Sequence, residues 1–228
     1  MVPYLYMVTR FTSQIPENMA DILGQHGVRP ASSLGGVAPD AIQFGSGNAA
    51  LDKFLEGGLA TGAVSEWGMP AGQSLREIAL AVVGGATRRE MMVLWVNGQD
   101  GLDVYPPAWS ARGVDLRFIR FVTANKPLEV LKPVFLEPVF RLMVLDSPKH
   151  LGSEEWAFIA RQARAMDIHV MVLHNFLLSG SRGNIWARLR INGKQRANGW
   201  RLEAMRGKAH KCLELTSDIL FGLPSLDM

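Results

Sequence analysis

The chain has little of what secreted and membrane proteins need. Its 228 residues include a single cysteine, Cys212, which excludes an internal disulfide framework and fits a reducing compartment. The apolar run Ile78–Val83 has only six residues, whereas a membrane helix needs about 18. The first residues, MVPYLYMVTRFTSQ, lack the basic start, apolar core and small-residue cleavage site of a signal peptide. We therefore expect a cytoplasmic protein that does not enter a membrane.

Charge is present but unevenly placed. The net charge is only +3, yet residues 182–211 contain nine Lys or Arg against one acid, Glu203, so this segment carries +8 and the remainder −5. The nine are Arg182, Arg188, Arg190, Lys194, Arg196, Arg201, Arg206, Lys208 and Lys211. An anionic polymer binds best where many charges are neutralised together, so this segment is typical of a nucleic-acid partner.

The order of apolar and amphipathic segments predicts an α/β fold. Uniformly apolar strands are expected at 62–67, 91–96, 117–122, 140–146 and 168–174, and helices between them at 75–90, 104–113, 126–137 and 153–167. Strands that are apolar on both sides belong to a parallel sheet with helices on both faces. The pattern then changes: residues 185–193 and 197–207 alternate like a C-terminal β-hairpin around KQR (194–196), and a last strand follows at 211–216.

We divide the chain into three parts. Residues 1–50 read as an N-terminal helical and loop arm, residues 51–216 as the core, and residues 217–228 as a C-terminal tail.

A stretch resembling a phosphate-binding loop follows the first core strand. Residues 68–74, GMPAGQS, place Gly68, Gly72 and Ser74 as a Walker A loop would, but the loop is one residue short and Gln73 stands where the lysine belongs. A functional loop uses backbone amides, a helix N-terminus and the lysine to hold phosphates. Taken alone, the stretch fits a chance glycine-rich turn as well as it fits a degenerate phosphate site.

Several segments together resemble the core of RecA-type recombinases. The run LDKFLEGGLATGAVSEWG (51–68) is similar to the segment that leads into their Walker A loop, and FRLMVLDS is similar to their Walker B strand with Asp146. At the position of the water-activating glutamate this sequence has Gln99, and Asn175 stands at the position of the γ-phosphate sensor. SGSRGN (179–184) falls at their second DNA-binding loop, and Arg206 and Lys208 echo a Lys-x-Lys pair. The resemblance implies a RecA-like core over about 50–215.

The departures from that family concern catalysis. Replacing the lysine by Gln73 removes a charge that stabilises phosphate, which costs on the order of 10²–10³ in rate. Replacing the glutamate by Gln99 removes a general base, typically worth about 10²–10⁴. We therefore expect no enzymatic activity, no cofactor and no metal, with Gly68, Gly72, Gln73, Ser74, Gln99 and Asp146 forming a degenerate nucleotide site.

Within the RecA-related proteins, the chain is similar to the ImuA family. This resemblance rests on the failed Walker A loop, the leading arm, the run GLATGAVSEW and the long basic C-terminal part. It implies an adaptor in the SOS response and error-prone translesion synthesis that works with an ImuB-like Y-family polymerase homologue and an error-prone C-family polymerase. RecA and self-association are further candidate partners. The alternatives are a SulA-like cell-division inhibitor and a weak RecA-type ATPase.

The basic segment is the candidate DNA-binding site, with single strands favoured. The assigned residues are Arg182, Arg188, Arg190, Lys194, Arg196, Arg206 and Lys208. Strand alternation predicts Arg188 and Arg190 on one face, and Trp186 and Trp200 suit base stacking. Five phosphate contacts by Arg182, Arg188, Arg190, Lys194 and Arg196 would give a log–log salt slope of about −3.5. The alternative is a solvated face with no such site.

Overall fold

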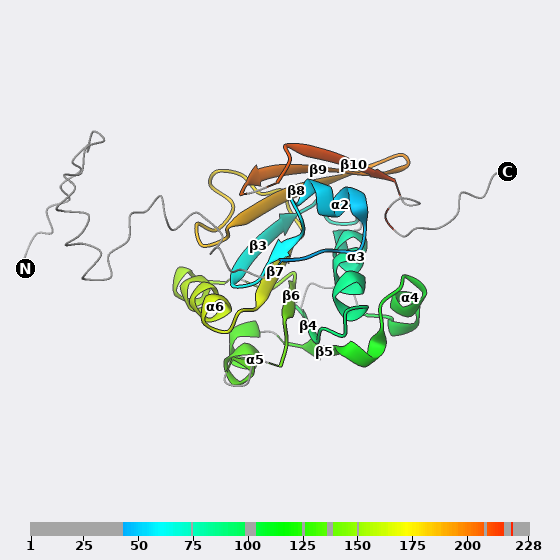
Figure 1. The fold of residues 1–228 in the computed structure, drawn as a ribbon. Coiled ribbons are helices and arrows are strands. Elements are labelled where there is room, and N and C mark those ends of the chain that lie inside the picture. Colours follow the sequence, from blue (N-terminus) through cyan, green and yellow to red (C-terminus); the bar gives the residue numbers. More distant parts are fainter. Residues whose placement is uncertain are drawn as a thin grey trace, which may run out of the picture. The chain divides into compact units, whose positions relative to one another are not determined.

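One eight-stranded sheet organises the protein in the computed structural model (Figure 1), which describes residues 43–73, 75–98, 104–124, 126–135, 139–149, 151–207, 209–216 and 220. The strand order is β10-β9-β8-β3-β7-β6-β4-β5. The strands are β3 (Ala63–Gly68), β4 (Val93–Asn97), β5 (Ile119–Thr123), β6 (Leu142–Asp146), β7 (His169–His174), β8 (Leu189–Arg196), β9 (Gly199–Arg206) and β10 (Cys212–Thr216). From β8 to β5 every pairing is parallel, whereas β9 and β10 add antiparallel strands.

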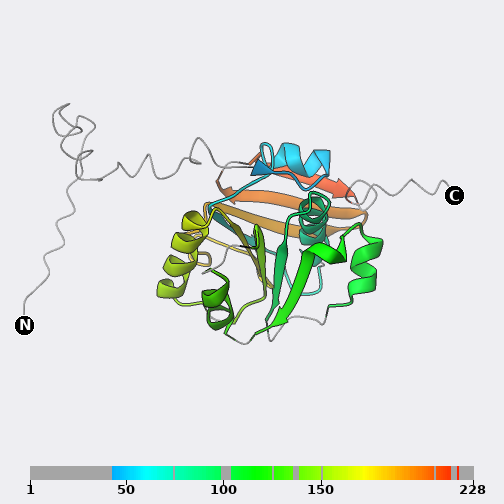
Figure 2. The ribbon, with the colours of Figure 1, turned by 60° about the horizontal axis from the view of Figure 1, so that its bottom comes forward.

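Helices cover both faces of the sheet, as the sequence predicts. One face carries α3 (Leu75–Thr87) and α4 (Pro106–Ala111) with a short 3-10 turn, η2 (Leu116–Phe118). Figure 2 shows α5 (Pro127–Val134) and α6 (Ser153–Ala165) on the opposite face. No helix in the described ranges is long and apolar enough to span a bilayer.

Two hydrophobic clusters result, one on each face of the sheet. Trp67 and Trp95 lie in the cluster beneath α3, while Val64 and Leu145 lie in the cluster beneath α6. All six residues of β3 are buried, because successive side chains point to opposite faces and both faces are covered. This explains why the central strands are largely apolar in sequence.

The first described residues belong to this same body. β1 (Gln43–Phe44) pairs antiparallel with β2 (Leu59–Ala60), and α2 (Ala49–Phe54) lies against β10. Phe44 and Phe54 are buried in the α3-side cluster. Residues 1–42 of the predicted arm, and the predicted tail apart from Leu220, lie outside the described residues, so the three-part division stays a prediction.

The C-terminal hairpin is confirmed, with its turn in a different place. β8 continues through Lys194, Gln195 and Arg196, which the sequence reading placed in the turn, and the chain reverses at Ala197 and Asn198. Lys194 pairs with Arg201 and Gln195 with Trp200. The two-residue reversal ahead of Gly199 extends the hairpin and keeps it continuous with the parallel sheet.

Candidate functional site

The loop after β3 is the first element of the site. β3 ends at Gly68, where a Cβ would lie 2.6 Å from the carbonyl oxygen of Phe176, so glycine permits a close crossing of two chain segments. Gly72 has φ +81°, and the amide of Gln73 donates to the carbonyl of Pro70 at 3.2 Å. The loop is thus a tight turn that leads into α3. Ser74 lies outside the described residues.

Gln73 connects this loop to the C-terminal hairpin. Its side-chain Oε1 accepts from the backbone amide of Gln195 at 3.0 Å, and its carbonyl accepts from the indole Nε1 of Trp200 at 3.3 Å. A Walker A lysine at this position would extend toward the β- and γ-phosphates of a nucleotide. Here the residue holds two parts of the fold together.

Asp146 ends β6 with its carboxylate buried. Arg76 Nε, from the first turn of α3, donates to Asp146 Oδ2 at 2.5 Å, and Ser147 Oγ donates to Oδ1 at 3.1 Å. Arg76 also reaches Asn97 Oδ1 at 3.4 Å. Burial raises the pKa of Asp146, while the Arg76 guanidinium opposes that rise. Asp146, which the sequence prediction compares with a Walker B carboxylate, therefore already has an internal cation beside it.

The other predicted members of the nucleotide site are only partly visible. Asn175 is exposed just beyond β7, and Gln99 lies outside the described residues. Among the residues that the structure describes, no cluster of three or more His, Cys, Asp or Glu could hold a metal ion.

Arg190 corrects the predicted DNA-binding set. Its side chain is only 11% exposed, and its Nη2 donates to the carbonyls of Ser179 at 2.5 Å and Arg182 at 2.9 Å. Its Nε lies 3.5 Å from the buried carboxylate of Glu66. Arg190 thus holds the 179–184 loop against the sheet, so it is not a free phosphate contact.

The remaining cations divide by exposure. Arg188 precedes β8 and is half-buried; burial, with a further contribution from nearby Arg164, lowers its pKa. Lys208 lies outside the described residues. Four assigned cations are exposed: Arg182, Lys194, Arg196 and Arg206. Because side chains alternate along a strand, Lys194 and Arg196 share the face of β8 on which Arg190 contacts Arg182.

The two tryptophans of the basic segment have different roles. Trp200 is 5% exposed, packs in the α3-side cluster and donates to Gln73, so its predicted role in base stacking is wrong. Trp186 is 46% exposed, and its neighbour Ile185 is 76% exposed. Arg206 Nη1 donates to the carbonyl of Ile185 at 2.9 Å. Trp186 is therefore the aromatic of this segment that a base could reach.

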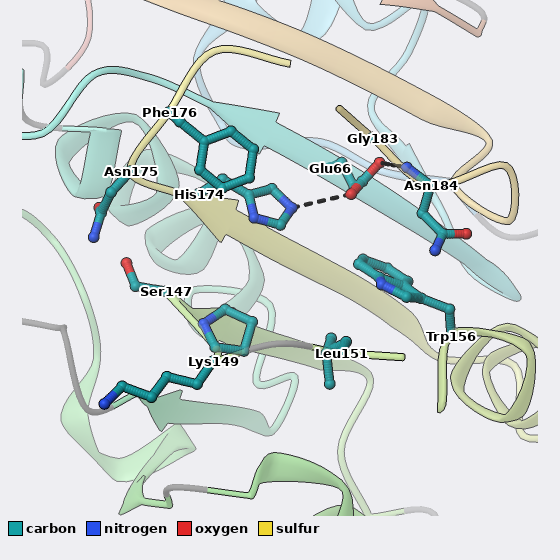
Figure 3. Close-up of a pocket in the computed structure, with 11 residues that line it drawn as sticks. Glu66, Ser147, Lys149, Leu151, Trp156, His174, Asn175, Phe176, Gly183 and Asn184 are labelled. Carbon is teal, nitrogen blue, oxygen red and sulfur yellow. Dashed lines mark hydrogen bonds and ion pairs between the residues drawn. The ribbon is translucent and has the colours of Figure 1, made fainter. Parts of the chain in front are cut away.

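Sequence reasoning missed a pocket of ≈ 420 Å³ at the carboxyl ends of β3, β6 and β7 (Figure 3). At its base Glu66 accepts from His174 Nε2 at 3.0 Å and from the amide of Asn184 at 2.6 Å. Trp156 of α6 and Phe176 also line it. The available signal was Glu66 itself, a charged residue inside a strand that is otherwise apolar or small, AVSEWG.

No family model matches the chain, and no curated protein matches it.

Proposed function

We propose that this protein is a non-catalytic, RecA-like DNA-binding adaptor of the DNA-damage response. The observation that carries the proposal is the pair Arg76–Asp146, in which an arginine of the chain itself neutralises the Walker B-like carboxylate. A magnesium ion would have to displace that arginine and leave it partly buried without its partner, which is costly. The site is therefore closed to the chemistry that its position suggests.

The state of the loop supports the same conclusion. Gln73 brings no positive charge to a phosphate, and both its side chain and its carbonyl are engaged by the hairpin. Phosphoryl transfer depends almost entirely on positioned charge, so losing the lysine and the free carboxylate together removes most of the rate enhancement. A weak ATPase, the alternative, would require this arrangement to open.

The exposed cations support DNA as the ligand. Lys194 and Arg196 lie toward the hairpin turn, and Arg182 lies in the loop that Arg190 holds over the same face of β8. Arg206 lies at the far end of β9, where it contacts Ile185 next to the exposed Trp186. We name these four cations and Trp186 the basic track. Separated cations beside an accessible aromatic ring suit a single strand, whose phosphates and bases are both reachable.

The cellular role rests on the resemblance to the ImuA family. It suggests partnership with an ImuB-like polymerase homologue, an error-prone C-family polymerase and RecA. A SulA-like division inhibitor, the other alternative, would act through protein contact and would have no use for the basic track. DNA binding therefore separates the two.

The test measures DNA affinity and ATP turnover on the same preparation. Four phosphate contacts predict a log–log salt slope of about −2.8 on a single strand, and Lys194→Glu with Arg196→Glu should reduce it to about −1.4. The matched control reverses two exposed lysines, Lys126→Glu at the N-cap of α5 with Lys132→Glu within that helix, and should leave the slope unchanged. ATP turnover at recombinase-like rates, or equal slopes for all three proteins, would contradict the proposal.

A further inference from the structure

The pocket beside α6, which we call the slot, has aromatic rings on one side. Figure 3 shows His174 and Phe176 on one side of it, Ser147 and Leu151 on the other, and Trp156 at one end. The centroids of the His174 and Phe176 rings lie 4.8 Å apart with a 38° tilt. A slot with aromatic rings on one side and an aliphatic chain opposite accommodates a flat group better than a globular one.

The polar side of the slot is held in place before any ligand arrives. Glu66 is almost fully buried, and His174, Asn184 and Arg190 all engage its carboxylate. Gly183 has φ +153°, and a Cβ there would collide with the Arg190 guanidinium in its present position, so glycine permits this close crossing of arginine and loop. A wall fixed in this way loses little freedom when a ligand binds.

One ring of the slot is left accessible. Phe176 is 41% exposed, whereas Trp156 is 5% exposed. Ser147, Asn175 and Asn184 add hydroxyl and amide groups to the lining, and Lys149 adds a positive charge. In Figure 3 the Lys149 side chain extends away from Glu66 and His174. Stacking rings, amides and a separate cation match the base, the base edges and the phosphate of a nucleotide.

We propose that this slot binds one nucleotide unit, with the base against Phe176 and His174 and the phosphate near Lys149. The unit comes either from a free mononucleotide or from a base turned out of a DNA single strand. The second source rests on the proposed function. It is favoured by position, because Asn184 of the slot and Arg182 of the basic track belong to the same Arg190-held loop.

The experiment uses 2-aminopurine, a base whose fluorescence falls when it stacks. The full-length protein is titrated with 2-aminopurine riboside monophosphate and, separately, with a thymidine oligonucleotide that carries one 2-aminopurine. Base stacking on an aromatic ring corresponds to about 5- to 150-fold in affinity. Phe176→Leu keeps an apolar side chain without the ring and should weaken whichever probe binds by at least the lower of these factors.

Two further variants make the outcome specific. Tyr105→Leu removes a ring that is 68% exposed and does not line the slot, so it should bind both probes as the unmodified protein does. Lys149→Gln should weaken the monophosphate several-fold and leave an unphosphorylated 2-aminopurine riboside unaffected. Thermal unfolding of each variant confirms that it is folded.

The results separate the slot from the basic track. Quenching of the monophosphate supports a free nucleotide as ligand, and quenching of the oligonucleotide alone supports a base within a strand. Should the oligonucleotide fail to bind at all, the proposed function fails, while the monophosphate still tests the slot. The inference is overturned if the unmodified protein quenches neither probe, or if Phe176→Leu binds each probe that the unmodified protein quenches with unchanged affinity.

Discussion

Replacing Arg76 by Met should destabilise the protein strongly, because it leaves the Asp146 carboxylate buried without its cation. The Asp146 side chain is 3% exposed and that of Arg76 is 23% exposed. Breaking a buried ion pair costs about 3–5 kcal/mol, and the partial exposure of Arg76 places the expected loss near the lower end, at about 3 kcal/mol. Urea unfolding at pH 7.5 measures this loss directly.

The same variant should recover stability in acid relative to the unmodified protein. Burial already raises the pKa of Asp146 and Arg76 opposes that rise, so removing Arg76 raises the pKa further. An acid whose pKa is higher in the folded state holds its proton more readily there, so its contribution to stability is greatest at low pH. That contribution is lost as pH rises from the unfolded pKa through the folded pKa. The deficit of Arg76→Met should therefore shrink between pH 7.5 and pH 5.

Two companion variants decide whether the reasoning holds. Arg76→Met with Asp146→Asn removes the buried charge and should regain most of the lost stability. Lys126→Met breaks a pair with Glu129 whose partners are 75% and 69% exposed, and should cost no more than about 1 kcal/mol. Three results would refute this account of the pair. They are a loss of unfolding free energy below about 1 kcal/mol for Arg76→Met, an equal loss at pH 7.5 and pH 5, or no regained stability when Asp146→Asn is added.

Three further predictions test other parts of the fold. Burial lowers the pKa of His169 from 6.5 to about 4, so its neutral form contributes fully to stability above pH 6.5. As pH falls to 4 the free energy of unfolding should drop by about 3 kcal/mol, because the unfolded chain binds the proton first. Urea unfolding of His169→Gln should not show this drop. Trp200→Ala should lower stability by about 3–5 kcal/mol, whereas Trp186→Ala should change it by no more than about 0.5 kcal/mol, as thermal unfolding would show. Gly68→Ala should cost about 1–3 kcal/mol, read as a lower urea midpoint, since its Cβ would meet the Phe176 carbonyl.

Local sequence patterns were sufficient to predict most of the fold. Apolar runs with turn signals between them located β3 to β7 and the helices that connect them, because a strand buried on both faces admits few polar residues at any position. The sequence likewise predicted that Gly68 and Asp146 end two strands at the same edge of the sheet, since parallel strands bring their carboxyl ends together there. The hairpin followed from its alternation, although the turn was placed too early.

What the side chains at those positions do was decided by contacts across the chain. Alternation places Arg190 on one face of β8 but does not predict that the 179–184 loop returns over that face. The sequence therefore suggested an exposed arginine, whereas the loop carbonyls of Ser179 and Arg182 bind its guanidinium. The sequence suggested that Trp200 could stack on a base, but the hairpin packs Trp200 into the α3-side cluster, where its indole donates to Gln73. Arg76 and Asp146 are 70 residues apart in the sequence. They meet because β7 lies between β3 and β6 in the sheet, and no local pattern predicts which strands are neighbours. Periodicity determines which way a side chain points; only the tertiary structure determines what it meets there.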